Sequence, residues 1–164
     1  MTETRLIKNG TFADHHFQTV ADDAPLPENG TIVSLARFLK ERESLLARNA
    51  PLGVKLQSSE SPEALGDDVQ RLSVIVLEFP KFRDGRAFSW ARMLRTRLGF
   101  KGEIRAAGPF LYDQLAFMAR TGFDAFEVRE NFTVTEFARA MNEMTYVYQP
   151  SADGRPTIRD LRAR

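Results

Sequence analysis

The feature that most constrains the fold is an alternation of short apolar strand patterns with amphipathic helix patterns, which repeats five times from Ile32 onward. The clearest strand pattern covers residues 73–79, which are β-branched and apolar except for Glu78, as is typical of a strand buried on both faces. Neighbouring parallel strands have to be joined by crossovers, and a helix between two strands supplies one. The alternation therefore predicts an α/β domain around a mainly parallel sheet of about five strands.

Capping and breaking residues mark where the expected helices begin and end. Ser61-Pro62 places a proline in the first turn of a helix, and Thr133 with Glu136 matches a capping box. Gly122 is placed to end another helix. The expected strands are residues 32–33, 52–56, 73–79, 103–106, 123–128 and 146–148, with the helices between them.

The two ends of the chain differ from this middle part. Asn9-Gly10 predicts a two-residue turn, so we expect an N-terminal β-hairpin over residues 5–20, with its last four residues extending it. The βα units then cover residues 32–149, which completes a single domain at residues 1–149. A polar tail at residues 150–164 is expected to be flexible. An open sheet and a partial TIM-barrel-like sheet both fit, because a closed barrel of eight βα units needs roughly 200 residues or more.

Several classes of protein are excluded by what the sequence lacks. The chain has no cysteine, which removes disulfides, thiolate catalysis and cysteine-held zinc or iron–sulfur clusters. It contains no HExxH, GxGxxG, GxSxG or glycine-rich phosphate loop, and adjacent His15 and His16 would point to opposite faces of a strand. We therefore predict no metal site and no cofactor. Without a long apolar run or a secretion signal, we expect a cytoplasmic protein with no membrane partner.

Positive charge is concentrated in one window of a nearly neutral chain. The net charge is +1, yet residues 81–105 hold eight basic and two acidic side chains, which leaves −5 for the remainder. Such a patch attracts an anion or an acidic protein surface. Its members Arg92, Arg95 and Arg97, with Lys101 close by, are also typical of the solvated face of an amphipathic helix. We do not expect nucleic acid as a partner, because no recognition motif accompanies the patch.

Three segments are expected to converge at the carboxyl ends of the strands, where parallel sheets bind ligands. They are the loop at residues 81–86, residues 105–108, and Glu127 with Arg129. Arginine forks there could hold an oxyanion, and the same side chains could dock a partner. The candidates are Lys81, Arg83, Asp84, Arg86 and Arg105. In an alternative interpretation, Asp84 caps the following helix and pairs with Arg86.

Glu78 is the candidate for a catalytic acid or base, because it is a carboxylate in an otherwise apolar strand. An unpaired carboxylate in such a place is costly, so it needs a partner or a raised pKa. We predict Arg105 as that partner. A purely structural salt bridge is the alternative, since structural pairs also perturb pKa values.

Several uninterrupted runs resemble a bacterial family of unknown function, the DUF934 family. They are LEFPKFRDGRAFSWARMLR at residues 77–95, GEIRAAG at residues 102–108, DQL at residues 113–115 and RTGFDAFE at residues 120–127. The opening Asn9-Gly10 and the terminal Tyr148-Gln149 also fit, so the resemblance covers essentially residues 5–149.

The resemblance implies a role in sulfite reduction. Members of the family are described as oxidoreductases of that process, because their genes lie beside the gene for the haemoprotein subunit of assimilatory sulfite reductase. Our leading hypothesis is an accessory protein or subunit of this system without its own redox cofactor, whose partner is the haemoprotein. The alternatives are a small enzyme that binds an oxyanion or phosphorylated ligand at the strand ends, and a structural homodimer. The sequence leaves open whether the protein is an enzyme.

Overall fold

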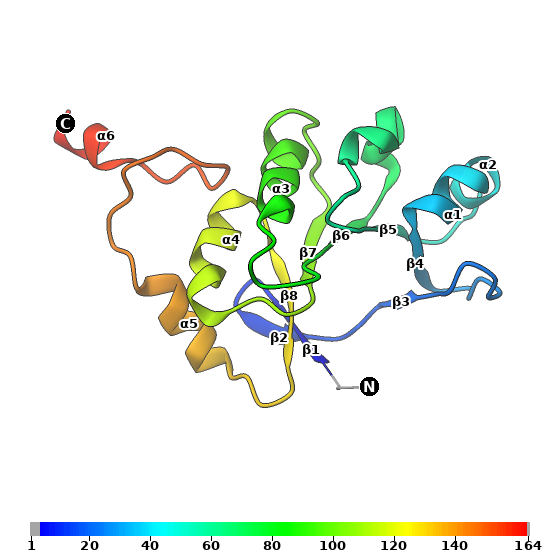
Figure 1. The fold of residues 1–164 in the computed structure, drawn as a ribbon, viewed down its shortest axis with the longest axis horizontal. Helices are drawn as coiled ribbons and strands as arrows, with labels where there is room; N and C mark the ends of the chain where they lie inside the picture. The colour runs from blue at the N-terminus through cyan, green and yellow to red at the C-terminus, as the bar shows by residue number, and fades with distance from the viewer. Residues whose placement is uncertain (1–3, 164) are drawn as a thin grey trace.

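The computed structural model describes residues 4–163, which form one eight-stranded sheet with helices between its strands (Figure 1). The strands are β1 (Thr4–Lys8), β2 (Thr11–Ala13), β3 (Phe17–Thr19), β4 (Gly30–Ser34), β5 (Leu52–Leu56), β6 (Val74–Glu78), β7 (Glu103–Ala107) and β8 (Ala125–Arg129). The α-helices are α1 (Leu35–Lys40), α2 (Arg42–Leu46), α3 (Arg86–Thr96), α4 (Leu115–Thr121), α5 (Val134–Asn142) and α6 (Ile158–Arg162), and the 3-10 helices are η1 (Pro62–Arg71) and η2 (Tyr112–Gln114).

The sheet is mainly parallel, as the alternation predicts. Its order is β2-β1-β8-β7-β6-β5-β4-β3, and every pair from β3 to β8 is parallel. Two predicted helix starts are confirmed: the Ser61 hydroxyl accepts a 3.3 Å bond from the Glu63 amide at the start of η1, and Thr133 with Glu136 forms the capping box of α5. The expected strand at residues 146–148 is wrong, because Val147 instead anchors the tail by accepting a 2.8 Å bond from the Ile158 amide.

The N-terminal hairpin is confirmed in its turn and corrected in its extent. β1 and β2 pair antiparallel around Asn9 and Gly10, whose positive φ values of 52° and 82° suit a two-residue hairpin turn. Phe17–Thr19 does not extend this hairpin: it forms β3, parallel to β4 at the opposite edge of the sheet. β1 also pairs antiparallel with β8, which the apolar pattern alone could not show.

The short link between the two edge strands forces the sheet to curl. In a flat sheet of eight strands the edges would lie about 34 Å apart, at roughly 4.8 Å per strand. Only residues 14–16 join β2 to β3, and four Cα steps span at most about 14 Å. The sheet is therefore a partial barrel, with the interleaved helices on one side and the link from β2 to β3 on the other (Figure 1).

Both faces of the sheet are buried. The convex face packs on the helices through a large apolar core that includes Ile75, Leu77 and Phe126, all 2 % exposed or less. The concave face holds a smaller apolar cluster, formed by Ile32, Val74, Val76 and Ala107, with Phe17 packed against it. Burial on both sides explains why the central strands have continuous apolar runs.

The tail beyond residue 149 ends in α6 and is bonded to the preceding chain through Asp153, Arg155 and Ile158. The Arg120 guanidinium on α4 lies 3.0 Å from the Asp153 carboxylate and donates a 2.6 Å bond to the Gln149 carbonyl. Among the described residues, no helix combines the length and the apolar character that crossing a membrane requires.

Candidate functional site

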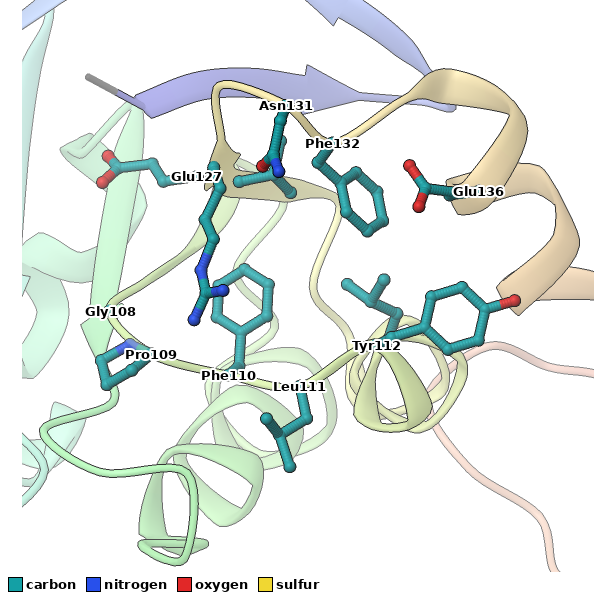
Figure 2. A pocket seen from close by; sticks show the side chains of 12 residues that line it. Gly108, Pro109, Phe110, Leu111, Tyr112, Glu127, Asn131, Phe132 and Glu136 are labelled. Carbon is teal, nitrogen blue, oxygen red and sulfur yellow. The ribbon is translucent and has the colours of Figure 1, made fainter. Parts of the chain in front are cut away.

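A pocket lies at the carboxyl ends of β7 and β8, the edge where parallel sheets bind ligands. This β7–β8 pocket has a volume of about 360 Å³. Its walls come from the loop after β7, the start of α4, the end of β8 and the loop into α5 (Figure 2). The residues used below to describe it are Gly108, Phe110, Tyr112, Glu127, Arg129, Asn131, Phe132 and Glu136.

Gly108 shapes the floor of this pocket. Its φ is +105°, and a Cβ built there would lie 2.2 Å from the carbonyl oxygen of Phe79. Only glycine avoids both the strained backbone and the clash. The loop can therefore turn sharply off β7 and carry Phe110 back across the core, where its ring lies 6.1 Å from that of Phe79 and 6.4 Å from that of Phe126.

Aromatic rings form much of the pocket wall. Figure 2 shows the rings of Phe110, Tyr112 and Phe132 around the opening, while the hydroxyl of Tyr112 points away from it. That hydroxyl is buried, which raises the pKa of Tyr112, with the nearby Glu143 carboxylate adding to the effect. The tyrosine therefore offers its ring rather than a reactive oxygen to the pocket.

Glu127 links the pocket to a set of alternating charges on the concave face, which we call the interior ionic cluster. Its members are Lys8, Glu103, Arg105 and Glu127. The Arg105 guanidinium, only 2 % exposed, lies 2.7 Å from the Glu103 carboxylate and 3.7 Å from that of Glu127, and the Lys8 ammonium lies 2.7 Å from Glu103. Burial alone would raise the pKa of Glu103, but the two cations lower it overall. The cluster is thus internally neutral.

The two remaining charges at the pocket differ in their bonding. The Glu136 carboxylate accepts 2.8 Å bonds from the amide and the hydroxyl of Thr133, which lower its pKa and tie it to the start of α5. Arg129 is exposed, and within residues 4–163 no carboxylate lies within ion-pair distance of it. The pocket therefore presents one uncommitted charge, and that charge is positive.

A second pocket, of about 270 Å³, lies at the carboxyl ends of β3 to β6 and contains Glu78. The Glu78 carboxylate pairs with the Lys55 ammonium on β5 at 2.8 Å. The predicted pairing of Glu78 with Arg105 is wrong, because the register sets Glu78 beside Ala107 and leaves Arg105 beside Val76, farther down the sheet. The sequence analysis did not identify Lys55 as the partner of Glu78. The signal for it was the position of Lys55 as the charged residue in the alternating strand pattern at residues 52–56.

The predicted oxyanion clamp of Arg83, Arg86 and Arg105 is not assembled. The Arg86 guanidinium lies 2.6 Å from the Asp84 carboxylate and 2.9 Å from the Ser58 hydroxyl, and Asp84 also accepts a bond from the Arg86 amide. Bonds from Arg86 and Ser58 hold the pKa of Asp84 far below its usual range. Of the alternative interpretation, the pairing of Asp84 with Arg86 is confirmed. The capping is wrong in position, because Gly85 is the N-cap of α3 and has no side-chain cap bond, and Asp84 accepts a bond from the amide of the first helical residue, Arg86.

The same loop carries an exposed feature that we call the docking surface, made of Lys81, Phe82, Arg83 and Phe117. Phe82 is 43 % exposed and Phe117 53 % exposed. The carbonyl of Phe82 accepts a 3.0 Å bond from the Gln114 side chain, which holds the loop against the start of α4, the helix that carries Phe117. Lys81 and Arg83 are exposed, and no ion pair involves them in the part of the chain that the structure describes.

The four residues of the predicted helical patch do not form one solvated face. Arg92 and Lys101 are exposed, and Arg97 is exposed but pairs with Glu63 at 3.1 Å. Arg95 is different, since its guanidinium is turned inward and binds backbone carbonyls and the Asp124 carboxylate. Arg95 therefore has a structural role, and the window's exposed cations without an ion-pair partner in residues 4–163 are Lys81, Arg83, Arg92 and Lys101.

Sequence reasoning placed Glu127 and Arg129 at this edge but missed the aromatic wall beside them. Phe110, Tyr112 and Phe132 lie in loops or short turns, where no periodicity indicates which way a ring faces. Across residues 4–163, no group of three or more histidine, aspartate or glutamate side chains is arranged to hold a metal ion.

Comparison with known proteins gives one family match. The sequence model of DUF934, a family of bacterial proteins of unknown function, matches residues 53–158, which include β6 to β8 and all of β5 except its first residue. No curated protein matches the chain. The matched segment exceeds half of the 164 residues, and so the chain belongs to the DUF934 family.

Proposed function

We propose that the protein is an accessory subunit of assimilatory sulfite reduction, which binds an acidic face of the sulfite reductase haemoprotein through its docking surface. The observation that carries the docking role is the pair of exposed phenylalanines, Phe82 and Phe117, beside Lys81 and Arg83, two exposed cations that form no ion pair within the described residues. The choice of partner comes from the family resemblance.

The composition of the docking surface is typical of a protein interface. Aromatic side chains are enriched at the buried centre of interfaces, and charged groups are found at the rim. Phe117 packs on Phe88 with ring centroids 5.1 Å apart, so it is already held in place before binding. The guanidinium of Arg83 lies 5.3 Å from the centroid of the Phe82 ring, which keeps charge and apolar surface together. Such a surface favours a partner with acidic residues around an apolar contact.

Co-elution of the full-length chain with its cognate haemoprotein, measured by light scattering on a sizing column at low and high salt, tests this proposal. We expect a complex of defined mass that weakens as salt screens the rim charges. The double variant Lys81→Glu/Arg83→Glu should abolish the complex. A matched control, Arg92→Glu/Lys101→Glu, makes the same change in net charge at exposed positions outside the docking surface and should leave it intact.

Either of two results would reject the proposal: separate elution of the two proteins at both salt concentrations, or equal loss of binding in the two charge-reversed variants. The same run gives the mass of the free chain, and a dimer would support the alternative of a structural homodimer. The alternative of a small oxyanion-binding enzyme predicts a higher Tm with millimolar sulfite, sulfate or phosphate. It is the less favoured alternative, since Arg86 and Arg105 already bind carboxylates of the chain.

A further inference from the structure

We propose that the β7–β8 pocket binds a small aromatic anion, a flat molecule of one or two fused rings that carries a carboxylate or sulfonate group. The rings of the ligand would lie among the aromatic side chains of the wall, and its anionic group would bind the guanidinium of Arg129. This site is separate from the proposed docking surface and does not depend on it.

The aromatic part of the inference rests on the wall and the volume. Phe110, Tyr112 and Phe132 line an opening of about 360 Å³, which lies in the range of small-molecule sites. Phe110 is fixed from behind by its edge contacts with Phe79 and Phe126, so the wall exists before a ligand arrives. Aromatic faces and edges prefer other rings in offset or T-shaped contact, which favours a flat ring over an aliphatic chain.

The anionic part rests on which charges are already used. Glu127 faces Arg105 in the interior ionic cluster, and Figure 2 shows its carboxylate directed away from the centre of the pocket. Glu136 is held by Thr133 in the capping box. Arg129 is left without a carboxylate partner in residues 4–163, and a guanidinium binds carboxylate and sulfonate groups with two parallel hydrogen bonds. The Asn131 side chain on the pocket lining adds a neutral hydrogen-bonding group.

The test uses three probes that separate ring from charge: 2-naphthalenesulfonate, its neutral counterpart 2-naphthalenesulfonamide, and methanesulfonate, which has the charge without the ring. Titration calorimetry on the full-length chain should show one site per chain for 2-naphthalenesulfonate. We expect the sulfonamide and methanesulfonate each to bind at least tenfold more weakly. Equal affinity for the sulfonate and the sulfonamide, tightest binding of methanesulfonate, or no binding of any probe would overturn the inference.

Two variants then assign the site. Arg129→Gln should weaken 2-naphthalenesulfonate at least tenfold and leave the sulfonamide within about twofold, whereas Phe132→Ala should weaken both probes. Arg92→Gln, which removes an exposed arginine elsewhere, should change neither affinity. If Arg129→Gln binds the sulfonate as the unaltered protein does, the anion site is not at Arg129 and the proposal fails. None of these results bears on haemoprotein binding, so the two proposals can fail separately.

Discussion

The two ends of the same strands, β7 and β8, use arginine in opposite ways. At their amino ends, Arg95 reaches from the last turn of α3, and its guanidinium binds four acceptors of the chain. Its acceptors are the carbonyls of Gly122 (3.0 Å), Phe100 (2.9 Å) and Gly102 (2.7 Å) and the carboxylate of Asp124 (2.9 Å). At their carboxyl ends, Arg129 stands exposed beside a pocket, and the part of the chain described here offers it no carboxylate.

The difference separates a structural edge from a binding edge. Each backbone carbonyl that Arg95 binds lies shortly before the start of β7 or β8, so one side chain fixes the entry of the chain into both strands. The carboxyl edge is instead surrounded by loops that leave two openings, as in other parallel α/β folds, where function lies at this edge and stability at the other. The comparison predicts that substitutions at the amino edge mainly change stability, and those at the carboxyl edge mainly change binding.

Removal of Arg95 should have the largest effect on stability. Arg95→Ala leaves three carbonyls without their donor and leaves the half-buried Asp124 carboxylate unpaired, which we expect to cost about 3 kcal/mol. For a chain of this length that corresponds to a Tm lower by about 10 °C. Urea denaturation and calorimetry measure both values. Arg92→Ala, at an exposed position on the same helix, is the control. An equal loss of unfolding free energy in that variant would contradict the structural role of Arg95.

The next largest loss of stability is expected from a substitution at Gly108. It would show that the carboxyl edge also contains a position at which a side chain destabilises the fold. Gly108→Ala adds a Cβ that would lie 2.2 Å from the Phe79 carbonyl oxygen, at a φ of +105°. Gly10→Ala also places a Cβ at positive φ, +82°, but meets nothing within 4 Å. We therefore expect Gly108→Ala to lose about 2 kcal/mol more than Gly10→Ala, measured by urea denaturation. Equal losses in the two variants would show that the close approach to Phe79 does not limit the loop.

A smaller, pH-dependent effect should distinguish the two faces of the amino edge. On the concave face, burial would raise the pKa of Glu103, but Lys8 and Arg105 lower it overall, so its contribution to stability is present above its ordinary value of 4.5 and is lost as pH falls. On the convex face, burial raises the pKa of Asp124 by more than Arg95 lowers it. Its contribution is therefore present below the ordinary value of 3.8 and is lost as pH rises through the raised pKa.

The two carboxyl groups thus oppose each other, and single variants should reveal each one. Between about pH 3.5 and 5.5, Glu103→Gln should make the fall of unfolding free energy on acidification shallower, and Asp124→Asn should make it steeper, each by less than about 1 kcal/mol. Urea titrations at a series of pH values measure the slopes. Parallel curves for the two variants would contradict the assigned directions.

The strands and helices of the middle of the chain could be predicted because their residue patterns are local. The apolar run at residues 73–79 and the capping box at Thr133 specify β6 and α5 without knowledge of the rest of the fold. Phe17–Thr19 could not be placed, since its partner β4 lies beyond a loop and a three-residue segment has no distinctive periodicity. The pairing of β1 with β8 joins residues more than 100 positions apart, and nothing in either segment specifies it.

The candidate site was predicted only in part: residues after β7 and β8 line the β7–β8 pocket, whereas the loop at residues 81–86 does not. Strand order brings the residues after β6, β7 and β8 to one edge, which parallel topology alone requires. Which charges neutralise one another depends on the register between neighbouring strands. Glu78 lies beside Ala107, two residues along β7 from Arg105, and Arg105 pairs with Glu103 and Glu127 instead. Arg95, predicted on a solvated face, binds backbone carbonyls ahead of the strand starts, because the helical pattern alone does not show which loops pack beside α3.

The smallest effect on stability is expected from Arg129→Gln, and it provides the sharpest test of the comparison. The residue pairs through its backbone with Thr4 in the β1–β8 ladder, and that pairing does not depend on the side chain. Among residues 4–163 the exposed guanidinium has no buried partner that would be left unsatisfied, so we expect the free energy of unfolding to stay within about 0.5 kcal/mol of the unaltered protein. Urea denaturation at neutral pH measures it beside Arg95→Ala. A loss as large as that of Arg95→Ala would mean that Arg129 holds the fold together, and its charge would then not be free for a ligand.

The opposite result combines two measurements on Arg129→Gln: its stability is unchanged, and it no longer binds 2-naphthalenesulfonate. In that case Arg95 stabilises the fold at the amino ends of β7 and β8, and Arg129 binds a ligand at their carboxyl ends.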